Sequence, residues 1–187
     1  ARRAGALLIA VDCDAACPGG FCRDVAAGPF AVAGCDLALT ALADDRVRGL
    51  VGDVRDEPRL MDALRGVQDV VHAAALKRVD TCESDPREAA ATNIGGTLAV
   101  ARACVERGVE RAVFLSTDKA VAPETLYGTT KLAGERLWLA SNVYGVGTGT
   151  AFAATRYGNV LGSTGSVVEY WRGAVARRAP LNLTDER

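Results

Sequence analysis

The stretch VERAVFLSTDKAVAPETLYGTTK, residues 109–131, joins an apolar run to a polar turn and then to the start of a helix. Its apolar part, residues 112–115, is typical of a strand that is buried on both faces of a parallel sheet. Ser116 to Lys119 would then lie at the carboxyl end of that strand, and a helix is predicted to begin near Leu126. Ionisable side chains cost free energy to hold near a core, so their concentration here indicates a functional site.

Strands and helices alternate on both sides of this stretch. Apolar runs predict the strands, and apolar residues at helical spacing predict the helices between them. The strand candidates are 6–12, 47–53, 67–75, 109–117 and 150–160, and the helix candidates are 57–66, 85–108, a segment from Leu126 and 166–178. This pattern predicts an α/β fold, a Rossmann-like doubly wound parallel sheet covered on both faces, with ligands at the carboxyl ends of the strands. Residues 1–187 are interpreted as one such domain.

The segment 85–108 is predicted to be one long helix. Pro86 suits its first turn, and Gly108 suits its C-terminal end. Gly95 and Gly96 weaken a helix, so both are expected to permit a close approach of another group. Its apolar face is expected to contain four residues at helical spacing, namely Leu98, Ala101, Cys104 and Val105.

The composition argues against several classes of protein. A chain of 187 residues, 49% of them hydrophobic, can bury the core of one domain. A net charge of -1 and few aromatic residues argue against a nucleic-acid partner. No apolar run is long enough to span a bilayer, and the start ARRAGALLIAVDCD is interpreted as a buried strand, so a cytoplasmic location is expected. Six Cys without a C-x-x-C pair and a single His argue against a metal site; His72 is expected to be a strand residue satisfied by hydrogen bonds.

Tyr127 and Lys131 form a Y-x-x-x-K pattern, which places both side chains on one face of a helix, one turn apart. An ammonium near a phenol stabilises the phenolate, so Lys131 is expected to lower the pKa of Tyr127. Tyr127 can then remove a proton from a hydroxyl while a hydride leaves the same carbon. The pattern alone also fits a solvated helix face, but its position after an apolar strand that ends in Ser-Thr favours the functional interpretation.

Asp118 and Lys119 are adjacent opposite charges at the end of the predicted strand. Such a pair in isolation indicates an exposed turn. In this context the two side chains supply an acid and a base side by side, because a desolvated lysine has a lowered pKa and can act as a base. Thr117 offers a hydroxyl donor to a substrate oxygen.

Five segments carry a resemblance to a known family: GDVRD (52–56), HAAALKRV (72–79), TNIGGT (92–97), LSTDKAVAPETLYGTTKLAGE (115–135) and RYGNVLGSTGSV (156–167). The chain from about residue 47 to 168 resembles the extended short-chain dehydrogenase/reductase family and, within it, the inverting UDP-N-acetylglucosamine 4,6-dehydratases and CapD-like polysaccharide biosynthesis proteins. Lys119 is the discriminating residue. Retaining dehydratases would carry Glu at this position, and epimerases usually carry Ser/Thr-Ser there, without an acid–base pair.

The resemblance implies a reaction. Tyr127, helped by Lys131, would assist oxidation of the sugar C4 hydroxyl by NADP, the expected cofactor, although the residues alone do not exclude NAD. Lys119 would then remove the C5 proton, and Asp118 would protonate the departing C6 hydroxyl. Hydride would return to C6 and a proton to the opposite face of C5. The division of acid and base roles among Asp118, Lys119 and Tyr127 stays open.

The resemblance also implies contacts with cofactor and substrate. Asp53 and Val54 would meet the adenine, and Tyr127 and Lys131 would bond to the nicotinamide ribose. The remaining contacts would come from Ala73, Ala74 and Lys77 along the pyrophosphate and ribose, from Asn159 and Val160 beside nicotinamide and substrate, and from Lys77 to the sugar nucleotide. The alternatives are simple turns at Asp53 and Asn159 and a solvated cation at Lys77.

Two regions depart from the family pattern. Residues 1–36 contain four of the six Cys and lack the Gly-rich fingerprint, so they are interpreted as atypical, with a shifted reading frame or a misannotated start as one hypothesis. The chain ends at PLNLTDER, where the resemblance implies that a substrate-binding region continues, so the chain is expected to be a fragment in which that region is largely missing.

Two other functions stay open. One is a UDP-sugar 4-epimerase of the same fold, and the other is a non-catalytic remnant or interaction module that lacks the cofactor. The expected partner is a UDP-sugar, and no nucleic acid or membrane insertion is expected. The family resemblance implies a homo-oligomer, although no interface stripe is evident in the sequence.

Overall fold

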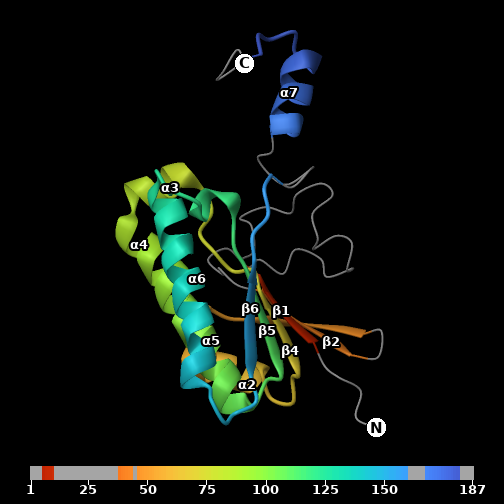
Figure 1. Cartoon of the computed structure of the whole chain (residues 1–187). Helices are drawn as coiled ribbons and strands as arrows, with labels where there is room; N and C mark the ends of the chain where they lie inside the picture. Colours follow the sequence, from red (N-terminus) through yellow and green to blue (C-terminus); the bar gives the residue numbers. More distant parts are fainter. Residues whose placement is uncertain (1–5, 11–37, 44–45, 160–166, 182–187) are drawn as a thin grey trace.

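The computed structural model describes residues 6–10, 38–43, 46–159 and 167–181 of the chain. Six strands form one sheet with the order β3-β2-β1-β4-β5-β6 (Figure 1). The strands are β1 (Ala6–Ala10), β2 (Ala38–Ala43), β3 (Arg46–Val51), β4 (Asp69–His72), β5 (Arg111–Leu115) and β6 (Ala151–Thr155). The order changes direction beside β1, which is the arrangement of a Rossmann-like sheet.

The strand directions bring four strand ends to one edge of the sheet. β1, β4, β5 and β6 pair in parallel, and β2 is antiparallel to both of its neighbours, β1 and β3. Because β2 alone is reversed, β3 runs in the same direction as the four parallel strands. The predicted α/β, Rossmann-like fold is confirmed, whereas strand β2 and its reversal were not predicted. The segments that follow β3, β4, β5 and β6 therefore all leave the sheet at the same edge.

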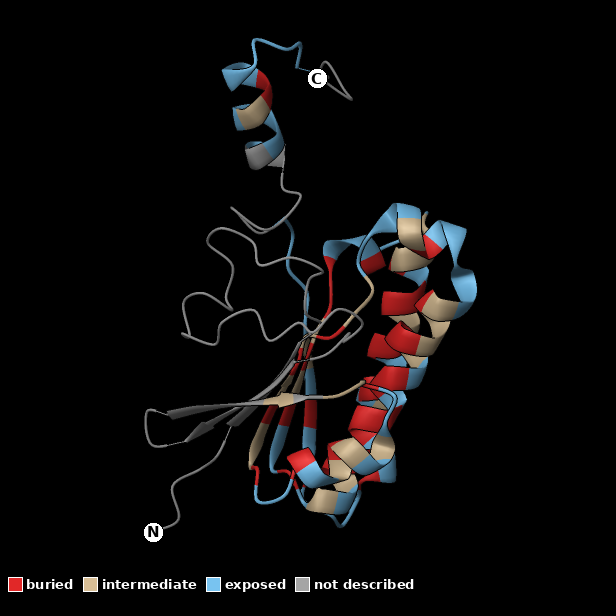
Figure 2. Cartoon of the chain, turned by 180° about the vertical axis from the view of Figure 1, so that it is seen from behind, coloured by how far each residue is buried: buried red, intermediate tan, exposed pale blue. Residues whose placement is uncertain are grey.

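The helices follow the predicted alternation, apart from the short helix Val79–Ser84, which was not predicted. They are α2 (Glu57–Ala63), α3 (Val79–Ser84), α4 (Pro86–Ala90), α5 (Thr97–Arg107), α6 (Leu126–Tyr144) and α7 (Val167–Ala176). In the described part of the chain, α2, α5 and α6 lie on one face of the sheet, and their buried residues face the strands, while α7 lies apart from this layer (Figures 1 and 2). Helix α6 begins as predicted, and the Thr125 hydroxyl caps it by accepting a hydrogen bond from Gly128 N at 3.2 Å.

The segment predicted as one long helix is divided into three parts. A π-helical turn, Ala91–Gly96, separates α4 from α5. A Cβ atom on Gly96 would lie 2.5 Å from Val54 Cγ1, so the expected close approach occurs there. A Cβ atom added at Gly95 would meet no atom of another part of the chain within 4 Å. Gly108 ends α5 with a positive φ of 67°, as predicted. Leu98, expected on the apolar face, is 39% exposed, because the buried face of α5 is centred on other residues, among them Thr97, Val100 and Cys104, and Leu98 lies outside it.

The core lies between the sheet and α5 and α6. Trp138 of α6 is fully buried and packs with its ring centroid 5.8 Å from Phe114 and 5.1 Å from Phe152. Over the residues that the structure describes, none of the helices combines the length and apolar character that crossing a bilayer requires. The same residues contain no group of three or more His, Cys, Asp or Glu side chains that could hold a metal ion.

Candidate active site

The candidate site begins where β5 and β6 leave the sheet. Ser116 N donates to Thr155 O at 2.7 Å, and Asp118 N donates to Tyr157 O at 2.9 Å. These two bonds continue the pairing of the strands beyond their ends. The segments after β5 and β6 therefore run side by side, and the residues that they carry are brought together.

The first group of side chains forms the rim of this site, which we define as Asp118, Lys119 and Asn159. Lys119 Nζ lies 3.0 Å from Asp118 Oδ1 and 3.3 Å from Asn159 Oδ1. The Lys119 and Asp118 side chains are 44% and 52% exposed, so the expectation of a desolvated Lys119 is wrong for the free protein. The hydrogen bond from Lys119, followed by one from Thr117 Oγ1 at 3.0 Å, lowers the pKa of Asp118. Asp118 is thus a carboxylate at neutral pH, and it must gain a proton before it can act as an acid.

The second group forms the floor of the site, which we define as His72, Phe114, Lys131 and Trp138. Lys131 is 2% exposed, and its Nζ donates to Leu115 O at 2.7 Å and lies 3.9 Å from the centroid of the Phe114 ring. Burial lowers the pKa of Lys131 to about 7, although the nearby Glu135 carboxylate acts in the opposite direction.

His72 is fully buried beneath Lys131. Its Nε2 lies 3.0 Å from Thr97 Oγ1, and Thr97 donates its only hydroxyl proton to Asn93 O at 2.7 Å. His72 must therefore carry its proton on Nε2. Nδ1 is buried without a hydrogen-bond partner among the described residues, so the expectation that hydrogen bonds satisfy this side chain holds for one nitrogen only. Burial, with help from the Lys131 charge, lowers the pKa of His72 to about 3, so the ring is neutral.

Tyr127 lies half-buried between floor and rim. Burial raises its pKa, and a hydrogen bond with Thr117 opposes that rise only in part. The expectation that Lys131 lowers the pKa of Tyr127 is therefore wrong for this structure. The physical reason is that Tyr127 loses hydration, while Lys131 directs its ammonium to the carbonyl of Leu115.

Gly128 allows helix α6 to approach the rim. A Cβ atom at this position would overlap with the carbonyl oxygen of Lys119 and lie 3.0 Å from Pro123 Cβ. Only glycine leaves room for this contact. The start of α6, with Tyr127, is thereby held against the turn that carries Asp118 and Lys119.

The predicted cofactor residues lie at the same edge of the sheet, after β3 and β4. The Asp53 carboxylate accepts hydrogen bonds from Arg55 Nε at 2.9 Å and Nη2 at 2.6 Å, and this pairing lowers its pKa. Arg55 also binds Glu88, so Asp53 belongs to an ion-pair network as it stands. Val54 is buried against Gly96. Beyond β4, Ala73 is partly buried, Ala74 is buried and Lys77 is exposed, whereas Val160 lies outside the described residues.

Asn93 was not recognised as a site residue from the sequence, but it connects the β4 loop to α6. Its Oδ1 accepts from Leu76 N at 2.7 Å, and its Nδ2 donates to Leu76 O and to Thr130 Oγ1, both at 3.0 Å. Thr130 in turn donates to Tyr127 O at 3.0 Å. Asn93 therefore couples the position of the β4 loop to that of Tyr127. The sequence pattern marked the TNIGGT segment that contains Asn93, but the direction of the Asn93 side chain depends on the π turn.

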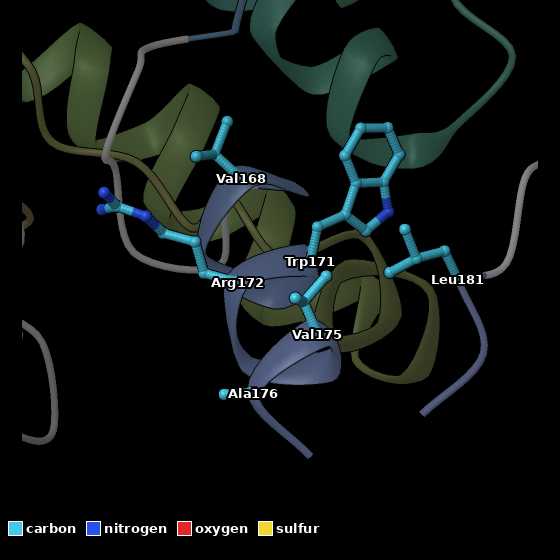
Figure 3. A pocket seen from close by; sticks show the side chains of 6 residues that line it. All are labelled: Val168, Trp171, Arg172, Val175, Ala176 and Leu181. Carbon is cyan, nitrogen blue, oxygen red and sulfur yellow. The ribbon is translucent and has the colours of Figure 1, made fainter. Parts of the chain in front are cut away.

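A separate apolar groove lies on α7 and does not coincide with these residues (Figure 3). It is lined by Val168, Trp171, Arg172, Val175, Ala176 and Leu181. It contains none of the predicted catalytic or binding residues, so the candidate active site is defined by the clustering of side chains at the sheet edge.

The sheet order, the Tyr-x-x-x-Lys helix that follows β5 and the polar residues at the end of β5 together define an extended short-chain dehydrogenase/reductase. Within this class, the chain belongs to the family described as "Polysaccharide biosynthesis protein", whose model matches residues 38–187. Residues 1–37 lie outside this match.

Individual relatives carry different names, two of which describe an enzyme activity. The chain is 47% identical over 142 residues to the UDP-N-acetylglucosamine 4,6-dehydratase (inverting) of Campylobacter jejuni subsp. jejuni serotype O:23/36 (strain 81-176). It is 41% identical over 145 residues to the UDP-glucose 4-epimerase of Rickettsia bellii (strain RML369-C). These alignments cover 75% and 78% of this chain but 42% of each relative. The chain thus spans about two-fifths of the length of these curated relatives.

A solved structure adds a bound cofactor to the comparison. DesIV, a dTDP-glucose 4,6-dehydratase from Streptomyces venezuelae with NAD and TYD bound, is 25% identical to the chain with a TM-score of 0.58. The match covers 70% of this chain and 45% of that chain. A protein with a similar fold therefore binds a nicotinamide cofactor.

Proposed function

We propose that the protein is an NADP-dependent nucleotide-sugar 4,6-dehydratase, which acts on UDP-N-acetylglucosamine with inversion at C5 in polysaccharide or glycan biosynthesis. The observation that carries the proposal is the environment of Lys119, whose ammonium lies between Asp118 and Asn159 at the end of β5. The 47% identity to an inverting 4,6-dehydratase supports it. Lys119 is also the residue that separates this reaction from that of the related epimerases.

Asp118 and Lys119 can supply both proton transfers of an elimination. In the free protein they are a carboxylate and an ammonium joined by a 3.0 Å hydrogen bond. If bound substrate removed water from the pair, the charged forms would be disfavoured, and transfer of one proton along this bond would give a carboxylic acid and a free amine. The amine of Lys119 then takes the C5 proton, and Asp118 gives its proton to the C6 hydroxyl, which leaves as water. Both groups return to their starting charge, so the pair balances without another acid or base.

The donors on α6 fit the ribose of a nicotinamide cofactor. Lys131 directs one N–H to Leu115 O, and with Tyr127 it would hold the ribose hydroxyls through its remaining hydrogens. A nicotinamide held there would supply hydride chemistry, namely removal of a hydride from C4 of the sugar and its return to C6. The proposed cofactor is NADP, and the NAD bound by DesIV is the alternative. Residues 11–37, which follow β1, lie outside the described residues, and the proposal assigns them no role in the reaction.

Tyr127 would accept the proton of the C4 hydroxyl. Its pKa is raised in the free protein, so it is a neutral phenol there and passes a proton on only when a base accepts one. The Thr117 hydroxyl shares a hydrogen bond with Tyr127. Because Asp118 would already hold the proton from Lys119, the C4 proton would pass from Tyr127 to solvent at the exposed rim, and a solvent proton would return to C5 when hydride is added at C6, so these two protons cancel. Oxidation at C4 acidifies the C5 hydrogen, and this makes its removal by Lys119 feasible.

The test is a reaction in deuterated water. The protein is incubated with UDP-N-acetylglucosamine and NADP+, with NAD+ in a parallel sample, and the products are followed by mass spectrometry and NMR. A 4-keto-6-deoxy sugar nucleotide with inverted C5 and solvent deuterium at C5 is expected. A C4 epimer formed without loss of water would replace the proposal by a 4-epimerase, the function named for the Rickettsia relative. No product and no thermal shift with either cofactor would indicate a non-catalytic module.

A further inference from the structure

Glu135 is a buried carboxylate that the proposed reaction does not use. It lies on α6, one turn after Lys131, and it is 6% exposed. Oε1 accepts from Arg156 Nη2 at 2.8 Å, and Oε2 accepts from Arg156 Nε at 2.9 Å and from Ser116 Oγ at 2.5 Å. A two-pronged arginine pair of this kind fixes geometry as well as charge.

The partners of Glu135 occupy equivalent places after two strands. Ser116 directly follows β5 and Arg156 directly follows β6, and backbone hydrogen bonds join the two segments on either side of this point. Lys119 and Asn159 each lie three residues beyond a partner of Glu135, and they meet at 3.3 Å. Glu135 thus fixes both segments at the positions from which the two rim residues extend.

Glu135 also supplies negative charge near Lys131. Among the described residues, two neutral groups also face Lys131, namely His72 of β4 and the phenol of Tyr127 on the same helix, and the uncharged Phe114 ring of β5 covers another side. Arg156 holds Glu135 ionised by lowering its pKa, with Ser116 assisting and Arg136 adding a weaker effect. The Glu135 carboxylate is therefore the nearby anion that opposes the loss of the Lys131 proton on burial.

We propose that Glu135 is a positioning residue, which aligns Lys119 with Asn159 through Ser116 and Arg156 and places a fixed negative charge one helical turn from Lys131. The proposal rests on the proposed function for the roles of Lys119 and Asn159. The effect on Lys131 concerns the free protein and needs no substrate or cofactor.

The test is the titration of Lys131 in two variants that are expected to shift its midpoint in opposite directions. Lysine labelled with 13C at Cε is followed by NMR across pH, and Lys131→Met assigns the signal. Glu135→Gln removes the anion, so the Lys131 midpoint is expected to fall by about one pH unit. Arg156→Gln removes the cation that compensates Glu135, so the midpoint is expected to rise. Glu106→Gln, an exposed change on α5, is the control and leaves the midpoint unchanged.

The geometric half of the proposal has its own measurement. Ser116→Ala keeps the Glu135 charge but removes one hydrogen bond, so the side-chain amide signals of Asn159 are expected to shift while the Lys131 midpoint stays within a few tenths of a pH unit. An unchanged Lys131 midpoint in both charge variants overturns the charge role, and unchanged Asn159 signals overturn the alignment role. If Glu135→Gln does not fold, Arg156→Gln still tests the charge role, and Ser116→Ala still tests the alignment role. Absence of dehydration by the wild-type protein would overturn the proposed function and leave the titration result standing.

Discussion

The floor and the rim of the candidate site are stabilised in different ways. In the floor, the His72 and Phe114 ring centroids lie 5.3 Å apart, and Lys131 is enclosed with its hydrogen-bond partner. In the rim, Lys119 and Asp118 form an ion pair, and about half of the surface of each side chain is exposed to water. Packing determines the floor, so changes there should act on the free energy of unfolding. Hydrated charges contribute little to stability, so changes in the rim should act on chemistry alone.

Trp138→Ala should give the largest difference between floor and rim. Trp138 is fully buried and donates Nε1–H to Ala153 O at 3.0 Å, so truncation leaves a cavity and removes one hydrogen bond to this carbonyl. The free energy of unfolding should fall by about 3–5 kcal/mol, as measured by denaturant titration. Tyr157→Ala, beside the rim at 45% exposure, should change it by about 0.5 kcal/mol or less. Equal losses would contradict the distinction between the two regions.

Gly128→Ala tests the contact between floor and rim. The added Cβ would overlap with the Lys119 carbonyl oxygen, which is backbone and cannot rotate away. We expect a loss of about 1–3 kcal/mol in the free energy of unfolding, because the helix must move from the turn. Gly95→Ala is the matched control, since no atom lies within 4 Å of its Cβ position, and it should stabilise by roughly 0.4–1 kcal/mol. A neutral Gly128→Ala variant would show that α6 does not depend on this approach.

Lys131→Met should change how stability depends on pH. The pKa of Lys131 is lowered from 10.5 to about 7 in the folded protein, so between these values the unfolded chain binds a proton that the folded chain does not. Stability therefore rises with pH across this window, by up to about 1.4 kcal/mol per pH unit from this one group. The difference in unfolding free energy between wild type and Lys131→Met should increase from pH 7 to 10 in denaturant titrations. A constant difference would mean that Lys131 keeps its proton in the fold.

Local sequence patterns were sufficient to predict most helices and strands, but not the contacts between them. The apolar run 112–115 and the caps at Thr125 and Gly108 act within a few residues, so β5, α6 and the end of α5 could be predicted. The reversal of β2 and the π turn depend on tertiary pairing, which periodicity does not reveal. The π turn explains why the importance of Asn93 was missed.

The electrostatics of the site depend on burial and on partners distant in the sequence. Y-x-x-x-K spacing placed Tyr127 and Lys131 on one helix, but it could not show that burial raises the pKa of Tyr127. Glu135 and Arg156 lie 21 residues apart and meet only because α6 crosses the end of β6. Asp118 and Lys119 are adjacent, so their pairing could be read directly from the sequence.

Lys119→Ala should have the smallest effect on stability and separates the rim from the floor most clearly. The ion pair with Asp118 is about half exposed, and such pairs contribute about 0–1 kcal/mol, so thermal unfolding should shift little. The same variant should lose deuterium incorporation at C5 and the 4-keto-6-deoxy product, because no amine remains to take the C5 proton. Asp118→Asn is the companion, since it keeps the side-chain size but cannot protonate the leaving hydroxyl. A Lys119→Ala variant that unfolds at much lower temperature would place Lys119 in the structural framework, and one that retains full dehydration would remove it from the reaction.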